Sequence, residues 1–101
     1  MEQRKKIAFK DGVCFLFSPL DKECEKAHFN FAEYKVGINR FYSALLAGVE
    51  VARVIQIPKS PIIIDGTESV IIEGEKYFIK QIQAQVETIP QTLVLTLSRT
   101  G

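Results

Sequence analysis

Apolar and polar residues alternate with a period of two in several short segments, which is the pattern of half-buried β-strands. The clearest case is residues 93–98, where three leucines alternate with valine, threonine and serine. Residues 51–57 alternate in a similar way and end at Pro58. We therefore expect a strand in each of these segments.

The N-terminal third is patterned less evenly. Residues 13–17 (Val-Cys-Phe-Leu-Phe) predict a strand with its valine and two phenylalanines on one face, and the phenylalanines of the chain mostly alternate as core residues do. Residues 18–27 are polar and contain a proline, so we expect a loop. Residues 28–36 predict a second strand, with Phe29 and Phe31 on the same side.

One short helix is expected in the middle of the chain. Asn39 is a suitable N-cap for residues 40–47, and Gly48 stands where a left-handed residue would end the helix. Apolar residues recur at helical spacing between positions 38 and 49. This stripe predicts a helix that packs on the sheet as a lid.

Residues 70–73 and 76–82 flank Gly74-Glu75 and predict a tight β-hairpin. A type II′ turn with Gly74 at its first central position fits, and Glu73-Gly74 as the central pair is the alternative. The two turns differ by one residue in register, so they place opposite side chains of the following strand in the core.

These elements predict a mainly β protein: a small antiparallel β-barrel or sandwich of five to six strands with one short α-helix. At 101 residues, with 47% hydrophobic and 25% charged content, the chain fits a single domain, 1–101, with one core. Residues 1–10 are expected to form a flexible basic N-terminus.

The formal charge of +1 gives no reason to expect a strong nucleic-acid binder or a membrane-surface protein. No apolar run approaches the ~20 residues that cross a bilayer, and residues 7–9 are too short for a signal-peptide core. The expectation is therefore a chain made in a reducing cytoplasm, in which Cys14 and Cys24 are free thiols.

Candidate chemistry is sparse. His28 is the single histidine, and no serine lies in a G-x-S-x-G elbow. Cys24-x-x-x-His28, with Cys14 as a third ligand, falls short of a metal site, and no glycine-rich phosphate loop occurs. The acidic residues, Glu68 among them, lie beside turns and are interpreted as solvated charges. We expect no enzyme activity, no metal and no cofactor.

An apolar run interrupts what should be a surface loop. It comprises Pro61, Ile62, Ile63, Ile64 and Asp65, which are the candidate interface residues of this sequence. An exposed apolar segment of this kind often marks a protein interface. The alternative, that the run folds back over the core, is weighted equally.

The stretch 36–99 resembles the head–tail connector proteins of tailed bacteriophages, in particular the head-closure (stopper, or head–tail adaptor) family. Residues 40–44 (Arg-Phe-Tyr-Ser-Ala) and Gly48 precede a strand at 53–57 in the order found in that family. The glycine-turn hairpin at 70–79 and the apolar strand at 93–97 complete the likeness.

The resemblance implies a structural virion protein that forms a ring below the portal, closes the packaged capsid and docks the tail. Its partners would be the portal or adaptor protein, tail-side proteins, other copies of itself and packaged DNA in the channel, with no membrane. It would be found at the head–tail junction of the virion, and in the host cytoplasm before assembly. One loop, 58–69 or 18–27, would face the channel, which makes Pro61–Asp65 channel-loop candidates as well.

A rival from another class is a small β-barrel that binds single-stranded nucleic acid. Arg4, Lys5, Lys6 and Lys10 make the N-terminus basic around Phe9, and exposed aromatic residues on small barrels can stack on bases. A solvated tail is the plainer interpretation of the same residues. A small accessory enzyme is the third hypothesis, which the lone histidine disfavours.

Overall fold

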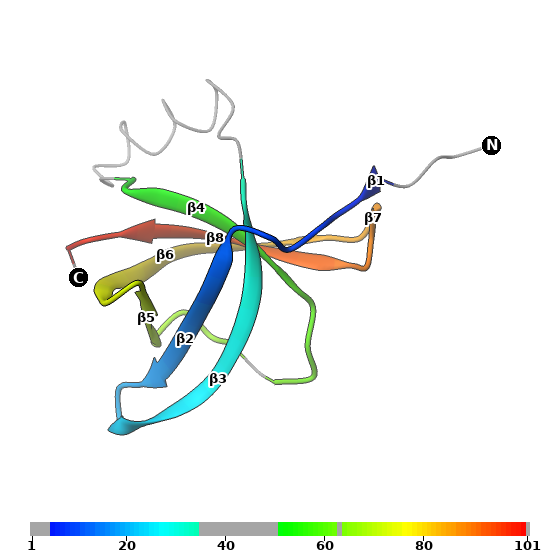
Figure 1. Cartoon of the computed structure of the whole chain (residues 1–101). Helices are drawn as coiled ribbons and strands as arrows, with labels where there is room; N and C mark the ends of the chain where they lie inside the picture. Colours follow the sequence, from blue (N-terminus) through cyan, green and yellow to red (C-terminus); the bar gives the residue numbers. More distant parts are fainter. Residues whose placement is uncertain (1–4, 35–50, 63, 101) are drawn as a thin grey trace.

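The computed structural model describes residues 5–34, 51–62 and 64–100, and all regular structure within them is β. The strands are β1 (Lys5–Lys6), β2 (Gly12–Ser18), β3 (Asp21–Glu33), β4 (Arg53–Pro58), β5 (Ser69–Ile72), β6 (Glu75–Gln85), β7 (Thr88–Ile89) and β8 (Thr92–Ser98). Six of them close into an antiparallel barrel in the order β2-β3-β4-β8-β6-β5 (Figure 1). The mainly β prediction is confirmed, and the architecture is a barrel rather than a sandwich.

Strands β2 and β3 form a long hairpin that projects from the body of the barrel (Figure 1). The loop expected over residues 18–27 is wrong, because β3 begins at Asp21 and only Pro19 and Leu20 make the turn. Asp21 Oδ1 accepts hydrogen bonds from the amides of Glu23 and Cys24, both at 3.2 Å, which holds the chain as it enters β3. Charged side chains misled the prediction, since a strand with one solvated face tolerates them.

The core is built from the inward side chains of all six barrel strands. Its buried members are Cys14, Leu16, Phe31, Ile55, Ile57, Val70, Ile72, Tyr77, Ile79, Leu95 and Leu97. Phe29 packs against this cluster beside Phe31, as the sequence predicts. Phe15 does not, because Cys14 and Leu16 occupy the inner positions of β2 and leave Phe15 on the outer face, 38% exposed.

The turn between β5 and β6 decides the register of both strands. Glu73 has a φ of 52° and Gly74 a φ of 80°, and Ile72 pairs with Glu75. Positive φ at both central residues is the mark of a type I′ turn. The turn is therefore the alternative, Glu73-Gly74, and the type II′ turn at Gly74-Glu75 is wrong; Tyr77 and Ile79 point into the core.

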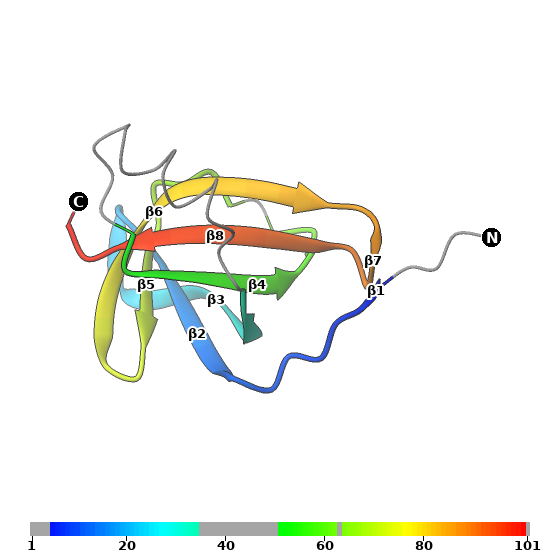
Figure 2. The same ribbon diagram turned by 90° about the horizontal axis from the view of Figure 1, so that it is seen from above.

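Strands β4, β8 and β6 lie side by side along one wall of the barrel (Figure 2). The outward residues of β4 and β8 are buried as well as the inward ones: Val54, Gln56, Thr92, Val94, Thr96 and Ser98 are each at most 4% exposed. The helix expected over 40–47 lies outside the described residues. Within the described ranges, no helix is long and apolar enough to cross a membrane.

The barrel is closed unevenly around its circumference. Strand β8 pairs with six residues of β4, whereas β3 and β4 pair over only two described residues, Ala32 with Gln56 and Glu33 with Ile55. The amide of Tyr34 adds one more bond, at 2.9 Å, to the carbonyl of Val54. Most of β3 thus has β2 as its one ladder partner, and no other described strand pairs with its second edge there.

Candidate interaction surface

The structure divides the candidate interface residues Pro61–Asp65. Pro61 and Ile62 are exposed, whereas Ile64 packs against the core cluster. Asp65 is exposed in a turn, and Ile63 lies outside the described residues. Both interpretations of this run therefore hold in part, with one isoleucine directed to solvent and another to the core.

A buried carboxylate fixes the end of this loop. Glu68 is 1% exposed, and its Oε2 lies 2.6 Å from Lys26 Nζ on β3. The same side chain accepts hydrogen bonds from the amides of Asp65 and Gly66. The interpretation of Glu68 as a solvated charge is thus wrong, because three donors replace the water it would lose on burial.

Asp65 itself accepts hydrogen bonds from the hydroxyl and the amide of Thr67, at 2.6 and 2.9 Å. These two bonds stabilise the charged form and lower the pKa of the Asp65 carboxyl. The residue shapes the loop through its hydrogen bonds to Thr67, and the positive charge of Lys26 lowers its pKa further.

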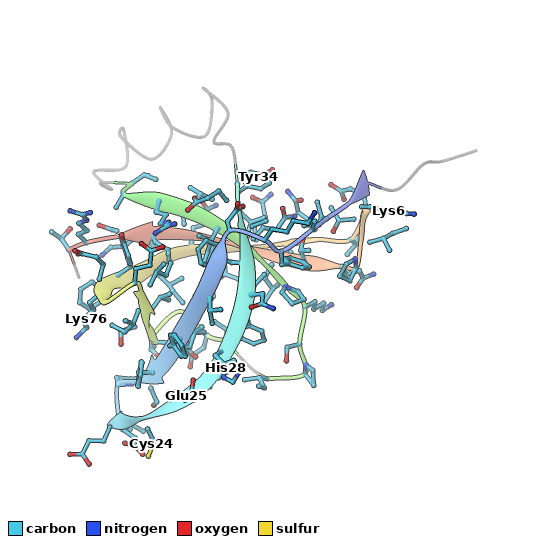
Figure 3. All side chains as sticks on the ribbon, viewed as in Figure 1. Lys6, Cys24, Glu25, His28, Tyr34 and Lys76 are labelled. Carbon is cyan, nitrogen blue, oxygen red and sulfur yellow. The ribbon has the colours of Figure 1, made fainter. Side chains whose placement is uncertain are left out.

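The outer face of the β2–β3 hairpin carries apolar side chains in solvent. Val13 and Phe15 are each 38% exposed, and Leu20 at the tip is 96% exposed. The Phe15 ring stands 6.0 Å from the His28 ring, tilted by 43°. His28 Nδ1 lies 3.2 Å from Glu25 Oε2, and Figure 3 shows Cys24, Glu25 and His28 along the same hairpin. We call Val13, Phe15 and Leu20 the hairpin patch.

The cysteines and the histidine do not meet in a site. Cys14 is buried in the core and Cys24 is exposed near the hairpin tip, both as free thiols. Burial raises the pKa of the Cys14 thiol to about 11, against a smaller opposing effect of its hydrogen bond to the Phe29 backbone. His28 points to the outside of β3, where its partner is Glu25. In the described part of the chain, no three such residues gather as metal ligands.

A groove with a volume of about 630 Å³ opens at the end of the barrel, where the N-terminal segment passes the end of β3. Residues 6–8 and Asp11 form one wall, and the end of β3 with Tyr34 forms another. The remainder is lined by Gln56, Gln85, Glu87 and Thr88. Lys6 and Tyr34 mark its position in Figure 3. The groove therefore joins segments from the beginning, middle and end of the sequence.

A chain of hydrogen bonds runs beneath the groove. Gln56 Nε2 donates to Thr92 Oγ1 at 2.7 Å and to Gln85 Oε1 at 3.2 Å, and Gln85 Nε2 donates to the Tyr34 hydroxyl at 2.9 Å. Thr92 Oγ1 is 3.1 Å from Thr88 Oγ1, which is 2.9 Å from the Pro90 carbonyl. This buried polar cluster was missed from the sequence, and its signal was polar Gln56 and Thr92 at the edges of apolar strands.

Two carboxylates of the groove are held in place by other groups. Asp11 Oδ2 accepts the amide of Glu33 at 2.7 Å, and Glu33 Oε1 accepts hydrogen bonds from the Arg53 guanidinium. Burial alone would lower the pKa of Arg53, but its hydrogen bonds to Glu33 and Tyr77 outweigh this and raise it. The Arg53 guanidinium also lies over the Phe31 ring, 5.1 Å from its centre.

Comparison with known proteins adds no relative to this picture. A scan of protein-family models finds no match, and searches of curated proteins and of solved structures find none that is significant.

Proposed function

We propose that this chain is a structural protein of the head–tail junction of a tailed bacteriophage, where copies form a ring below the portal. The ring would close the packaged capsid, contact DNA in the channel and present a surface to tail-side proteins. Catalysis is not part of this role, and the chain would act through the surfaces it offers to neighbours.

The observation that carries the proposal is the hairpin patch. Three apolar side chains stand in solvent on an element that projects from the barrel. Val13 and Phe15 lie two residues apart on one face of β2, and Leu20 lies in the turn at the tip of the same hairpin. Exposed apolar side chains gathered on one element often mark an interaction site. A projecting hairpin also reaches past the body of its own subunit, as a contact between neighbours in a ring requires.

The open edge of β3 adds a second means of contact. Between Glu23 and Asn30 its backbone has ladder bonds to β2 alone among the described strands. Unpaired strand edges accept an added strand from another chain. In a ring such contacts are heterologous, because the hairpin of one copy meets a different surface on the next.

The test begins with the genome, where portal and capsid genes are expected upstream and tail genes downstream. The chain would then be produced together with the neighbouring portal protein and examined by electron microscopy and native mass measurement. Rings on the portal are expected for the wild type and for Val86→Ser, which removes an exposed apolar side chain away from the hairpin. The double change Phe15→Ser and Leu20→Ser is expected to abolish them while leaving the β-sheet circular dichroism intact.

A wild type that never joins the portal at any concentration, or a gene flanked by metabolic genes alone, would overturn the proposal. Ring formation by the double variant at the wild-type concentration would instead show that the hairpin patch is not the contact.

The second candidate function is binding of single-stranded nucleic acid, favoured by the outward ring of Phe15 beside His28. The charges nearby count against it, because Glu25 contacts His28 and Glu23 precedes them on the same strand. Binding of a fluorescent oligothymidylate distinguishes the two. A nucleic-acid protein would lose affinity steeply with added salt, whereas a ring component is expected to show weak binding throughout.

A further inference from the structure

The donors and acceptors of the hydrogen-bond chain beneath the groove can be assigned in order. That assignment determines which side-chain atom of Gln56 is available to a ligand. Thr88 has one hydroxyl hydrogen, and at 2.9 Å it faces the Pro90 carbonyl, which can only accept. The hydroxyl of Thr92 must then donate to Thr88, 3.1 Å away, so Thr92 Oγ1 is an acceptor toward Gln56. The Gln56 side chain therefore turns its NH₂ group to Thr92.

This orientation leaves one strong acceptor without a donor. Both side-chain hydrogen bonds of Gln56 within the described part of the chain use Nε2, to Thr92 and to Gln85, so Oε1 receives none there. Gln56 is 4% exposed and lines the groove. A buried amide oxygen without a partner is costly, and a ligand that donates to it recovers that cost.

The charges around the groove indicate the kind of donor. Three carboxylates line it, those of Asp11, Glu33 and Glu87, against the single ammonium of Lys6. Arg53, which is not in the lining, is paired with Glu33. Among the described lining residues, Asp11 and Glu87 then stand against Lys6, an excess of one negative charge. A cation with several N–H groups matches both the carboxylates and the Gln56 oxygen.

We infer that the groove is a socket for an arginine side chain presented by a partner protein chain. A guanidinium has five N–H donors in one plane, so it can serve the Gln56 oxygen and a carboxylate together, which a lysine ammonium does with less directional fit. Ile7, Ala8 and Ala32 add apolar surface at the groove for the aliphatic part of the side chain and its neighbours. The inference goes beyond the proposed function and concerns the isolated chain.

The test is a titration of the isotope-labelled full chain with N-acetyl-argininamide, followed through the side-chain NH₂ signals of Gln56 and Gln85 by NMR. The matched control ligand is N-acetyl-citrullinamide, which has nearly the same shape and no charge. Saturable shifts of both glutamine signals at millimolar arginine derivative are expected, with no shift from the citrulline compound. A five-residue peptide with a central arginine is expected to bind more tightly than the single residue.

Variants at the exposed rim sharpen the result without disturbing the buried cluster. Glu87→Gln removes one rim charge and should weaken binding roughly two- to fivefold, whereas the adjacent Val86→Ser should leave it unchanged. Absence of shifts at Gln56 and Gln85, or equal shifts with citrulline, would overturn the socket. Equal affinity for the peptide and the single residue would overturn the protein partner in favour of small guanidinium compounds. Because no portal protein is present, these outcomes are separate from failure of the ring.

Discussion

Strands β2 and β8 are each seven residues long and lie in the same barrel, yet their outer faces differ in an unexpected way. On β8 the outward residues include Thr92, Thr96 and Ser98, which are polar and buried. On β2 the outward residues Val13 and Phe15 are apolar and exposed. Hydrophobicity alone would assign the two faces the other way round.

The difference shows that the residues of each outer face are determined by interactions other than packing in the shared core. Thr92 of β8 belongs to the hydrogen-bond chain that orients Gln56 under the groove. The apolar residues Val13 and Phe15 of β2 are only partly covered by the described chain, and this is why the hairpin patch is the proposed contact. Four changes test this comparison.

The largest effect is expected from Leu95→Ala on the inner face of β8. Leu95 is fully buried in the core cluster, so truncation leaves a cavity and should lower the free energy of unfolding by about 3 kcal/mol. Urea unfolding followed by circular dichroism measures this. A loss below about 1 kcal/mol would mean that the barrel wall collapses around the missing side chain.

Thr92→Val is expected to have the next largest effect. Valine has nearly the shape of threonine but leaves Gln56 Nε2 and Thr88 Oγ1 without their buried partner, which should cost about 1–2 kcal/mol. The same urea experiment applies. Val86→Thr, the reverse change at an exposed position, serves as the control and should change stability by less than about 0.5 kcal/mol.

The third change concerns the inner face of β2, where the buried Cys14 thiol should make stability depend on pH. Its folded pKa of about 11 lies above the ordinary thiol pKa of 9.0, so the unfolded chain loses this proton first and the free energy of unfolding falls as pH rises through that window. Between pH 8 and pH 10 the loss from this group should be about 1.4 kcal/mol. Cys14→Val should remove that part of the pH dependence, and parallel curves for the two proteins would contradict it.

The smallest effect on stability is expected from Phe15→Ala on the outer face of β2. The ring is already partly in solvent, so the free energy of unfolding should change by less than about 1 kcal/mol. Self-association or portal binding should fall in the same variant. A stability loss as large as that of Leu95→Ala would show that Phe15 serves the fold and not a partner.

Local patterns predicted much of the barrel correctly. The alternation in 93–98 and 51–57 marks β8 and β4, and the glycine turn marks the β5–β6 hairpin. Period-two patterns locate strands but leave open which face is inward when both carry apolar residues. This is why Phe15 was misassigned while Phe29 and Phe31 were placed correctly.

The remaining errors concern contacts between distant residues. The residues near Glu68 in the sequence do not indicate its partner Lys26, which lies 42 positions earlier. Glu68 was therefore interpreted as a solvated charge, although it forms a buried ion pair. The groove likewise depends on Asp11, Gln56 and Thr88, which come together only when the barrel closes. The local sequence favoured the type II′ turn at Gly74-Glu75, whereas the folded chain has Glu73-Gly74 as the central pair.

The short junction between β3 and β4 determines where the barrel should open locally. Two residue pairs and one further amide bond hold these strands together in the described structure, against six pairs between β4 and β8. The amides bonded across this junction are the ones that should exchange with deuterium first, ahead of those between β4 and β8. The barrel thus has a seam, and transient parting along it would lengthen the free edge that β3 already offers to a neighbouring chain.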